Sequence, residues 1–306
     1  MIEVQIINAF VDNEQGGNPA GVVLNADNFT NSQKLLIASK VGLSETAFVS
    51  KSDVADFKLD FFTPNRQIAH CGHATIATFS YLSQSGKIGQ SNTSKETIDG
   101  VREILIKDDF AFMEQKAPKF IDVSSKKDDI LRSLSLQETD ILEDSPILLV
   151  NTGNSFIIVP VKDSAILKNI QPNFELISQI SEALDLIGYY VFTTDMTNLE
   201  RDVNTRMFAP RYGIEEEAGT GMAAGPLACY FYEILNVKKQ RFLIQQGHFM
   251  STPSPSLIIV DLIIEDNKII KLMAGGKGAS ISQIMIDLNP LTSDSLKMNY
   301  ELLTIK

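Results

Sequence analysis

Two uncharged stretches of this 306-residue chain decide its fold. Residues 73–86 read His-Ala-Thr-Ile-Ala-Thr-Phe-Ser-Tyr-Leu-Ser-Gln-Ser-Gly, and residues 218–232 read Ala-Gly-Thr-Gly-Met-Ala-Ala-Gly-Pro-Leu-Ala-Cys-Tyr-Phe-Tyr. Neither stretch contains Asp, Glu, Lys or Arg. A helix that is apolar or small on every side is buried all round rather than lying on a surface. We therefore predict helices at His73–Ser85 and Gly219–Leu235, and two domains, each a sheet wrapped around one of them.

Strands dominate the rest of the chain. Fourteen runs have the β-branched composition and the turn residues at their ends that are typical of strands, and two of them are Lys268–Met273 and Ser282–Leu288. Three more helices are expected, at Ser32–Lys40, Asp128–Ser133 and Phe174–Leu184. Many strands with few helices, without a βαβ alternation, favour a mainly antiparallel α+β fold.

The domain boundary is placed where regular structure is weakest, in Lys116–Lys127, which contains Pro118. The predicted domains are residues 1–118 and 119–285, and the C-terminal segment, about 286–306, is expected to return to the first domain. The polar stretch Ser85–Thr97 is interpreted as a hairpin loop inside the first domain.

Composition excludes several classes of protein. With 27 Lys and Arg against 38 Asp and Glu, the formal charge is −11, so no basic stripe is available for nucleic acid or an anionic membrane surface. The most apolar run, Leu257–Ile264, is far shorter than the roughly 20 residues that span a bilayer. Two cysteines without a CxxC pair suit a reducing compartment and argue against a structural zinc site. A cytoplasmic protein is expected.

The approaches to the two buried helices are alike. Phe61-Phe62-Thr63-Pro64 leads to Gly72, and Met207-Phe208-Ala209-Pro210 leads to Gly221. The pattern suggests an internal duplication, although two short patterns can also coincide by chance. Unpaired N–H groups at a buried helix start bind carboxylate or phosphate. Two such starts facing one cleft would hold a small carboxylate-bearing substrate, and the alternative is that Thr220 or acidic side chains cap them.

Several titratable residues are candidates for chemistry. In a period-two strand, Glu45 shares a face with Leu43, Ala47 and Val49, where unpaired burial would raise its pKa, unless it is a solvent-facing residue at a strand start. His73, in the first turn of the helix, is expected to be a neutral imidazole that serves either structure or function. His70 and His248 carry no distinctive pattern, and Cys71 is expected to be a buried, inert thiol rather than a thiolate.

Taken together, the motifs resemble the PhzF-like (phenazine-biosynthesis-like) isomerases, which are related in fold to diaminopimelate epimerase and proline racemase. The matching stretches are Phe10-Val11-Asp12, Gly17-Asn18-Pro19-Ala20-Gly21, Leu43-Ser44-Glu45-Thr46-Ala47-Phe48, Phe61-Phe62-Thr63-Pro64, Cys71-Gly72-His73-Ala74-Thr75, Arg206-Met207-Phe208-Ala209-Pro210, Thr220-Gly221, Gly225-Pro226-Leu227 and Gln245-Gln246-Gly247. They span nearly the whole chain in the family's order.

The resemblance implies two pseudo-symmetric domains, each a curled, mainly antiparallel sheet around a central buried helix, with the site between them. It also implies a homodimer without metal or cofactor. Glu45 matches the glutamate that moves a proton between carbons, and His73 matches the histidine that holds the substrate. Glu217 stands where the family typically has an aspartate, and Met222 where it has a serine. The predicted substrate-binding residues are Asn18, Gly72, Thr220, Gly221 and Met222.

These expectations define an isomerase that acts on a small carboxylic acid, with Glu45 as acid/base and with His73 and Glu217 orienting the substrate. Two alternatives remain open. One is an amino-acid or hydroxy-acid epimerase or racemase that uses Cys71 or Glu45, although Thr220 stands where the two-cysteine racemases have their second thiol. The other is a small-acid binder without catalytic activity.

Overall fold

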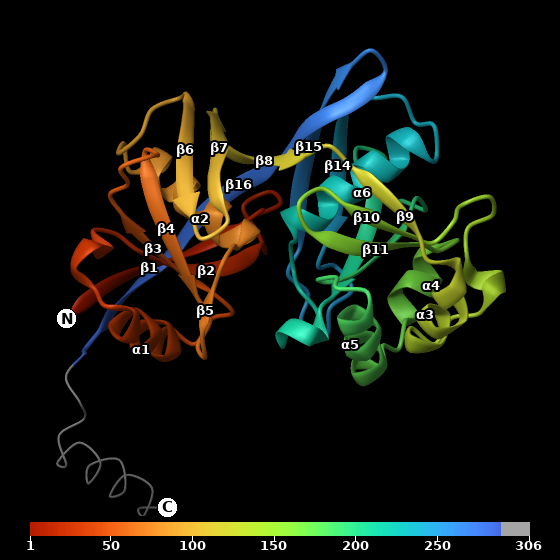
Figure 1. Ribbon diagram of the computed structural model, residues 1–306, viewed down its shortest axis with the longest axis horizontal. Helices are drawn as coiled ribbons and strands as arrows, with labels where there is room; N and C mark the ends of the chain where they lie inside the picture. The colour runs from red at the N-terminus through yellow and green to blue at the C-terminus, as the bar shows by residue number, and fades with distance from the viewer. Residues whose placement is uncertain (289–306) are drawn as a thin grey trace, which may run out of the picture.

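A computed structural model describes residues 1–288 as two lobes joined by long strands (Figure 1). The fold is a mixed α/β structure built on a curled sheet, as predicted in its coarse class. Most neighbouring strands are antiparallel, and within residues 1–288 the parallel pairs are β2–β3, β4–β6, β11–β12 and β13–β14. The helices and strands are β1 (Ile2–Ala9), β2 (Asn18–Val23), α1 (Asn31–Val41), β3 (Thr46–Ser50), β4 (Phe57–Phe62), β5 (Gln67–Ile68), α2 (Gly72–Gln84), β6 (Asn92–Thr97), β7 (Gly100–Lys107), β8 (Phe110–Lys116), β9 (Lys119–Asp122), α3 (Lys127–Ser133), β10 (Leu148–Asn151), β11 (Ser155–Pro160), α4 (Ser164–Asn169), α5 (Phe174–Ala183), β12 (Gly188–Thr193), β13 (Val203–Phe208), α6 (Gly221–Glu233), β14 (Arg241–Gln246), β15 (Ser256–Glu265) and β16 (Lys268–Ile286).

In the first lobe the sheet closes on itself. The strand order β1-β2-β3-β4-β6-β7-β8-β16 ends on a strand that pairs back to β1. Helix α2 contacts strands on several sides of this ring, including β1, β2, β8 and β16, and ten of its residues are buried. The absence of charge in residues 73–86 therefore has the predicted cause, because no side of α2 faces solvent along most of its length.

In the second lobe the order β16-β15-β14-β13-β12-β11-β10-β9 continues the same sheet. Helix α6 contacts β10, β11, β15 and β16, and eleven of its residues are buried. Both uncharged stretches thus form buried helices, which confirms this prediction. The pseudo-symmetry of the lobes and the boundary near residue 118 stay predictions.

Strand β16 joins the lobes. Its first part pairs with β15 and β8, and its last part, from Gly278 to Ile286, pairs with β1. The sequence predicted two strands here, and the structure has one strand, 19 residues long. The misleading signal was the glycine cluster in the middle of the strand. A Cβ on Gly275 would lie 2.1 Å from the Ala111 carbonyl oxygen, so these glycines permit close packing and do not mark a turn.

Four elements were missed. Strand β6 lies inside the stretch that was interpreted as a loop, β9 lies in the predicted boundary region, and the two-residue strand β5 and helix α4 were not predicted at all. Strand β6 carries no apolar run, and its place is fixed by pairing with β4 and β7. Such pairing depends on the partner strands, so local composition does not reveal it.

The segment predicted to return to the first lobe, about residues 286–306, lies almost wholly outside the described residues. Within residues 1–288, no helix is long and apolar enough to cross a membrane.

Candidate active site

A pocket of about 190 Å³ lies between the two lobes. Its wall combines side chains from both halves of the chain, in agreement with the predicted cleft. The lining residues are Glu45, Ile68, Ala69, His70, Asp99, Asn154, Ile187, Met207, Tyr212, Ile214, Glu217, Thr220 and Met222. Four of the predicted site residues, Glu45, Glu217, Thr220 and Met222, are therefore in the wall. The other four, Asn18, Gly72, His73 and Gly221, lie directly behind it, in contact with or next to wall residues.

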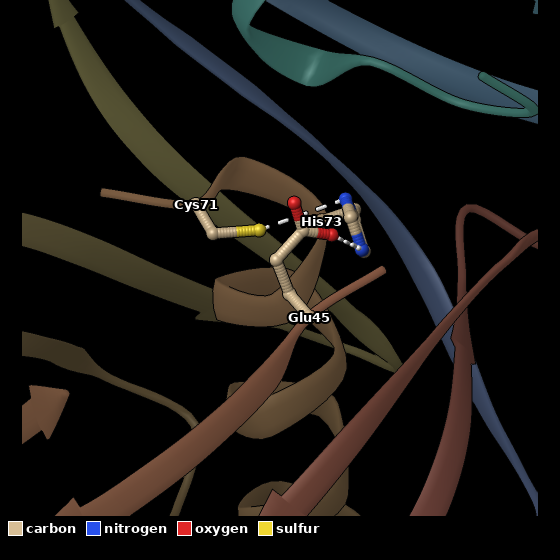
Figure 2. Close-up of side chains that lie close together, drawn as sticks. All are labelled: Glu45, Cys71 and His73. Carbon is tan, nitrogen blue, oxygen red and sulfur yellow. Dashed lines mark hydrogen bonds and ion pairs between the residues drawn. The ribbon is translucent and has the colours of Figure 1, made fainter. Parts of the chain in front are cut away.

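The centre of the site is an imidazole between two carboxylates. Nε2 of His73 lies 3.2 Å from Oε2 of Glu45, and Nδ1 lies 3.0 Å from Oε1 of Glu217. All three side chains are almost completely buried. Figure 2 shows Glu45 rising from the chain just before β3 toward the start of α2, where Cys71 precedes the helix and His73 lies in its first turn. Of the two alternatives left open for Glu45, the structure has the buried one, and β3 begins one residue after it.

The contact at the Glu45 end is looser than the contacts of Glu217. Oε2 of Glu45 and Nε2 of His73 form a buried ion pair at 3.2 Å, but neither atom makes a well-aligned hydrogen bond within residues 1–288. Catalytic hydrogen bonds are often loose in the free enzyme and tighten in the substrate complex. The Glu45 carboxylate is therefore held by charge attraction to His73 rather than by an aligned hydrogen bond.

The Glu217 end is held firmly. Nδ2 of Asn18 donates to Oε1 of Glu217 at 2.9 Å, and Oγ1 of Thr220 donates to Oε2. Nε2 of Gln246 donates to the Glu217 carbonyl at 2.7 Å. Asn18 and Thr220 were predicted to bind substrate, and in this structure both fix the second carboxylate. Gln246 lies in one of the matching motifs, but nothing in its sequence context pointed to a role.

The pKa directions follow from this arrangement. Burial raises the pKa of Glu45, but the charge of His73, with smaller interactions of His73 and Ser44, outweighs burial and brings it below its ordinary value. Burial disfavours the charged ring of His73, but the Cys71 side chain, the Glu45 carboxylate and the contact with Glu217 raise its pKa well above the ordinary value. The neutral ring expected for His73 is therefore wrong, and the upward shift that unpaired burial would give Glu45 does not apply, because His73 pairs with it. Sequence reasoning considered the burial of Glu45 and His73, but it did not predict that they lie beside each other, and the charged neighbour decides the direction of each pKa shift.

The starts of both buried helices lack side-chain caps. The alternative that Thr220 or nearby acids cap them is therefore wrong. The two starts also meet, because a Cβ on Gly72 would lie 3.1 Å from Cγ of Met222. The sulfur of Met222 in turn accepts a hydrogen bond from Nδ2 of Asn154 at 3.3 Å. The predicted pair of converging, uncapped helix starts is present, and Met222 lies across it.

The acidic run Glu215-Glu216-Glu217 precedes α6, and no acid lies in the first turn of this helix. Glu216 forms a bidentate pair with Arg206, at 2.8 Å on both nitrogens, and only Glu217 enters the site. Arg206 lies on β13 and pairs with Glu216, whereas the next residue, Glu217, contacts His73.

Glu45, Cys71 and His73 offer three metal-ligand atoms within 4.8 Å of one another. Contacts that these residues already make compete with metal binding. Sγ of Cys71 lies 3.6 Å from Nδ1 of His73, and burial raises the pKa of the thiol, which keeps it protonated. A thiol must lose its proton to bind a metal, and each nitrogen of the ring already faces a carboxylate. The inert thiol expected for Cys71 agrees with this direction of its pKa.

Sequence reasoning missed two residues next to the pocket. His70, set aside as a loop residue, is part of the wall. Lys95, in the stretch interpreted as a loop, is completely buried behind it. Burial alternates at Lys95 and Thr97 along β6, but this strand has no apolar residue whose alternation could have shown it in the sequence.

Comparisons with known proteins assign the family. The model of the PhzC-PhzF family, described as phenazine biosynthesis-like protein, matches residues 7–283. The chain belongs to this family. It is 36% identical over 232 residues to an uncharacterized isomerase of Clostridium acetobutylicum, covering 73% of this chain and 77% of that protein.

Solved structures agree with this assignment. The PhzF-family phenazine biosynthesis protein of Bacillus anthracis superposes with a TM-score of 0.84 at 27% identity, covering 94% of this chain and 99% of that one. A hydroxyproline epimerase of Agrobacterium vitis shares the fold alone, with a TM-score of 0.59 at 13% identity, covering 95% and 92% of the two chains. Family membership and isomerase relatives together support an isomerase or epimerase.

Proposed function

We propose that this protein is a cofactor-independent isomerase that moves a proton between two carbons of a small carboxylic acid. Glu45 is the acid/base: it takes a proton from a carbon beside an electron-withdrawing group and returns it to another carbon. The observation that carries the proposal is the buried carboxylate of Glu45 in the pocket wall, ionised beside His73 and with one oxygen not engaged in a well-aligned hydrogen bond.

His73 and Glu217 orient the substrate and balance its charge. The lowered pKa of Glu45 keeps this group ionised at neutral pH, as a base in the first step must be. The imidazolium, 3.2 Å away, then stabilises negative charge that develops on the substrate as the proton leaves.

The substrate carboxylate is held by backbone N–H groups at the two helix starts, at Gly72, His73, Gly221 and Met222. Within residues 1–288 no side chain caps either start, and the helix dipoles favour an anion there. Because Met222 lies against Gly72, its flexible side chain turns aside when the carboxylate enters. The two lobes and their helices form the pseudo-symmetric pair that the family resemblance implies, and the protein acts as a homodimer.

A ligand screen followed by hydrogen exchange tests this function. Cyclic and aromatic carboxylic acids are screened by thermal shift, in which a ligand at 100 Kd adds about 2.7 kcal/mol of stability. Each acid that binds is incubated with the protein in D₂O and followed by NMR. We expect deuterium at the carbons between which the proton moves.

The decisive variant is Glu45→Gln, which keeps size and removes basicity. Exchange should fall by about 10²–10⁴-fold while the acid still binds. The matched control is Glu215→Gln, the same change at an exposed neighbour of Glu217, which should exchange as wild type does. Unchanged exchange in Glu45→Gln contradicts the proposal. Exchange only at the α-carbon, with inversion, indicates an epimerase, and binding without any exchange indicates a non-catalytic binder.

A further inference from the structure

Lys95 is a buried cation without a carboxylate partner. Its side chain is completely buried on β6, 5.0 Å from the ring centroid of Phe61. Its ammonium nitrogen contacts Oγ1 of Thr75 at 2.5 Å and Nδ1 of His70 at 3.3 Å. The other buried lysine within residues 1–288, Lys34, pairs with Asp60 at 2.5 Å, so the surroundings of Lys95 are unusual even in this chain. A lysine is buried in this way only at a cost in stability, which calls for a functional explanation.

Counting hydrogens fixes the state of this group. Oγ1 of Thr75 donates its hydrogen to the Cys71 carbonyl at 2.6 Å, so it can only accept from Lys95. In its charged form, below a pKa of about 7, Lys95 has no lone pair, so it must also donate to Nδ1 of His70. Nδ1 therefore carries no hydrogen, and the proton of the neutral ring lies on Nε2.

The nearby charges keep that ring neutral. Burial first, and then the positive charges of Lys95 and Arg102, lower the pKa of His70 well below its ordinary value. Asp99, in the turn between β6 and β7, and Cys71 are the other titratable groups that act on Lys95. His70 is part of the pocket wall, and within residues 1–288 its Nε2 has no hydrogen-bond partner and is not sealed from solvent.

We propose that His70 is a specificity-determining residue that donates a hydrogen bond from Nε2–H to a second oxygen of the substrate. Lys95 is the positioning residue that fixes this tautomer of His70. The substrate is then a small carboxylic acid with a further acceptor oxygen, such as a hydroxyl or a carbonyl group. This inference rests on the proposed function for the identity of the site, but its first test needs no turnover.

That first test is the tautomer of His70. Long-range ¹H–¹⁵N NMR spectra of the ¹⁵N-labelled full chain distinguish the two neutral forms of each histidine ring. We expect His70 to be neutral with its proton on Nε2 below pH 7, where Lys95 is charged. In Lys95→Met the Nδ1 partner is lost, and both tautomers should become populated. A proton on Nδ1 in the wild type, or an unchanged single tautomer in Lys95→Met, overturns the role of Lys95.

The second test compares two probes, benzoate and 3-hydroxybenzoate, by calorimetry. We expect the wild type to bind the hydroxylated probe about 3- to 10-fold more tightly, as one neutral hydrogen bond allows. His70→Phe keeps an aromatic ring against Phe61 and should lose this preference, whereas His70→Gln keeps a donor and should retain part of it.

Equal affinity of the wild type for both probes, a preference that survives in His70→Phe, or no binding of either probe overturns the role of His70. Glu45→Gln separates this inference from the proposed function. That variant abolishes exchange, but it should leave both the His70 tautomer and the probe preference unchanged. A failure of the exchange test alone therefore refutes the acid/base and not the recognition of a second oxygen.

Discussion

Two histidines three residues apart in the sequence are held in opposite charge states. His73 lies between two carboxylates, and its pKa is raised well above the ordinary value. His70 lies beside an ammonium group, and its pKa is lowered well below that value. Burial alone would lower the pKa of both rings. The partners of His73, from the chain before β3 and before α6, reverse this direction, whereas the positive neighbours of His70, among them Lys95 on β6, reinforce it.

The contrast divides the pocket into two regions with different functions. The His73 region holds the charges that a proton transfer needs, with a base and a cation in contact. The His70 region presents a neutral donor, which selects among ligands and cannot take up the proton that Glu45 removes. An enzyme with one base and one recognition group needs both a charged and a neutral histidine. The fold produces them by placing carboxylates around His73 and a lysine beside His70.

The largest effect that breaks this contrast is expected from His73→Gln. Removal of the cation should lower the rate of exchange about 10²–10³-fold, the cost of losing one preorganised donor to developing charge. It also removes the group that lowers the pKa of Glu45, so burial then raises that pKa above its ordinary value. The acid limb of the pH–rate profile should therefore lie below pH 4.5 in the wild type and move to higher pH in the variant.

A matched control for this prediction is His248→Gln, the same change at a histidine outside the pocket wall. Its profile should match the wild type. If the acid limb of His73→Gln stays where it was, then Glu45 is not the group that titrates, and the assignment of the base is wrong.

The sequence was a good guide to half of this comparison. The uncharged stretches predicted two buried helices, and the motifs around Glu45, His73 and Glu217 predicted residues that meet at one pocket. These signals are local: a run without charge, or a motif within a few residues. The family resemblance then connected motifs that lie far apart in the chain.

The other half could not be predicted, because its cause is not local. Lys95 lies in a polar strand that only its pairing with β4 and β7 defines. Nothing near His70 in sequence shows that a lysine 25 residues later will lie 3.3 Å from its ring. The charge state of His73 was missed for the same reason, since both carboxylates reach it from distant segments.

The next effect concerns the contribution of the His70 region to the stability of the protein. Burial lowers the pKa of Lys95 to about 7 from an ordinary 10.5, so the charged form is disfavoured in the folded state. Between these two values the unfolded chain binds more protons, and the stability of the wild type rises with pH there. Lys95→Met removes the buried charge and should stabilise the protein by a few kcal/mol at pH 6, with a gain that shrinks from pH 7 to 10.

Lys34→Met is the matched comparison, because it removes a buried lysine that has a carboxylate partner. It leaves Asp60 without its cation and should destabilise the protein at pH 6. Chemical denaturation of both variants at a series of pH values measures the difference. Destabilisation of the same size in both variants would show that Lys95 is an ordinary paired cation. The conclusion that Lys95 is buried as a charge without a carboxylate partner would then be wrong.

The smallest effect is expected at the residue that stands between the two histidines, Cys71. Its thiol keeps its proton because burial raises its pKa, and it contributes only a contact of 3.6 Å to Nδ1 of His73, which also has Glu217 at 3.0 Å. Cys71→Ser should therefore change the exchange rate less than about threefold, the size of one weak hydrogen bond. A chelator such as EDTA should leave the wild-type rate unchanged, because the same protonated thiol is a poor metal ligand. An epimerase that uses this thiol predicts instead that Cys71→Ser abolishes exchange, and a metal centre predicts that chelation does. The first result would make Cys71, rather than Glu45, the residue on which the chemistry depends, and the second would assign the chemistry to a metal held by Glu45, Cys71 and His73.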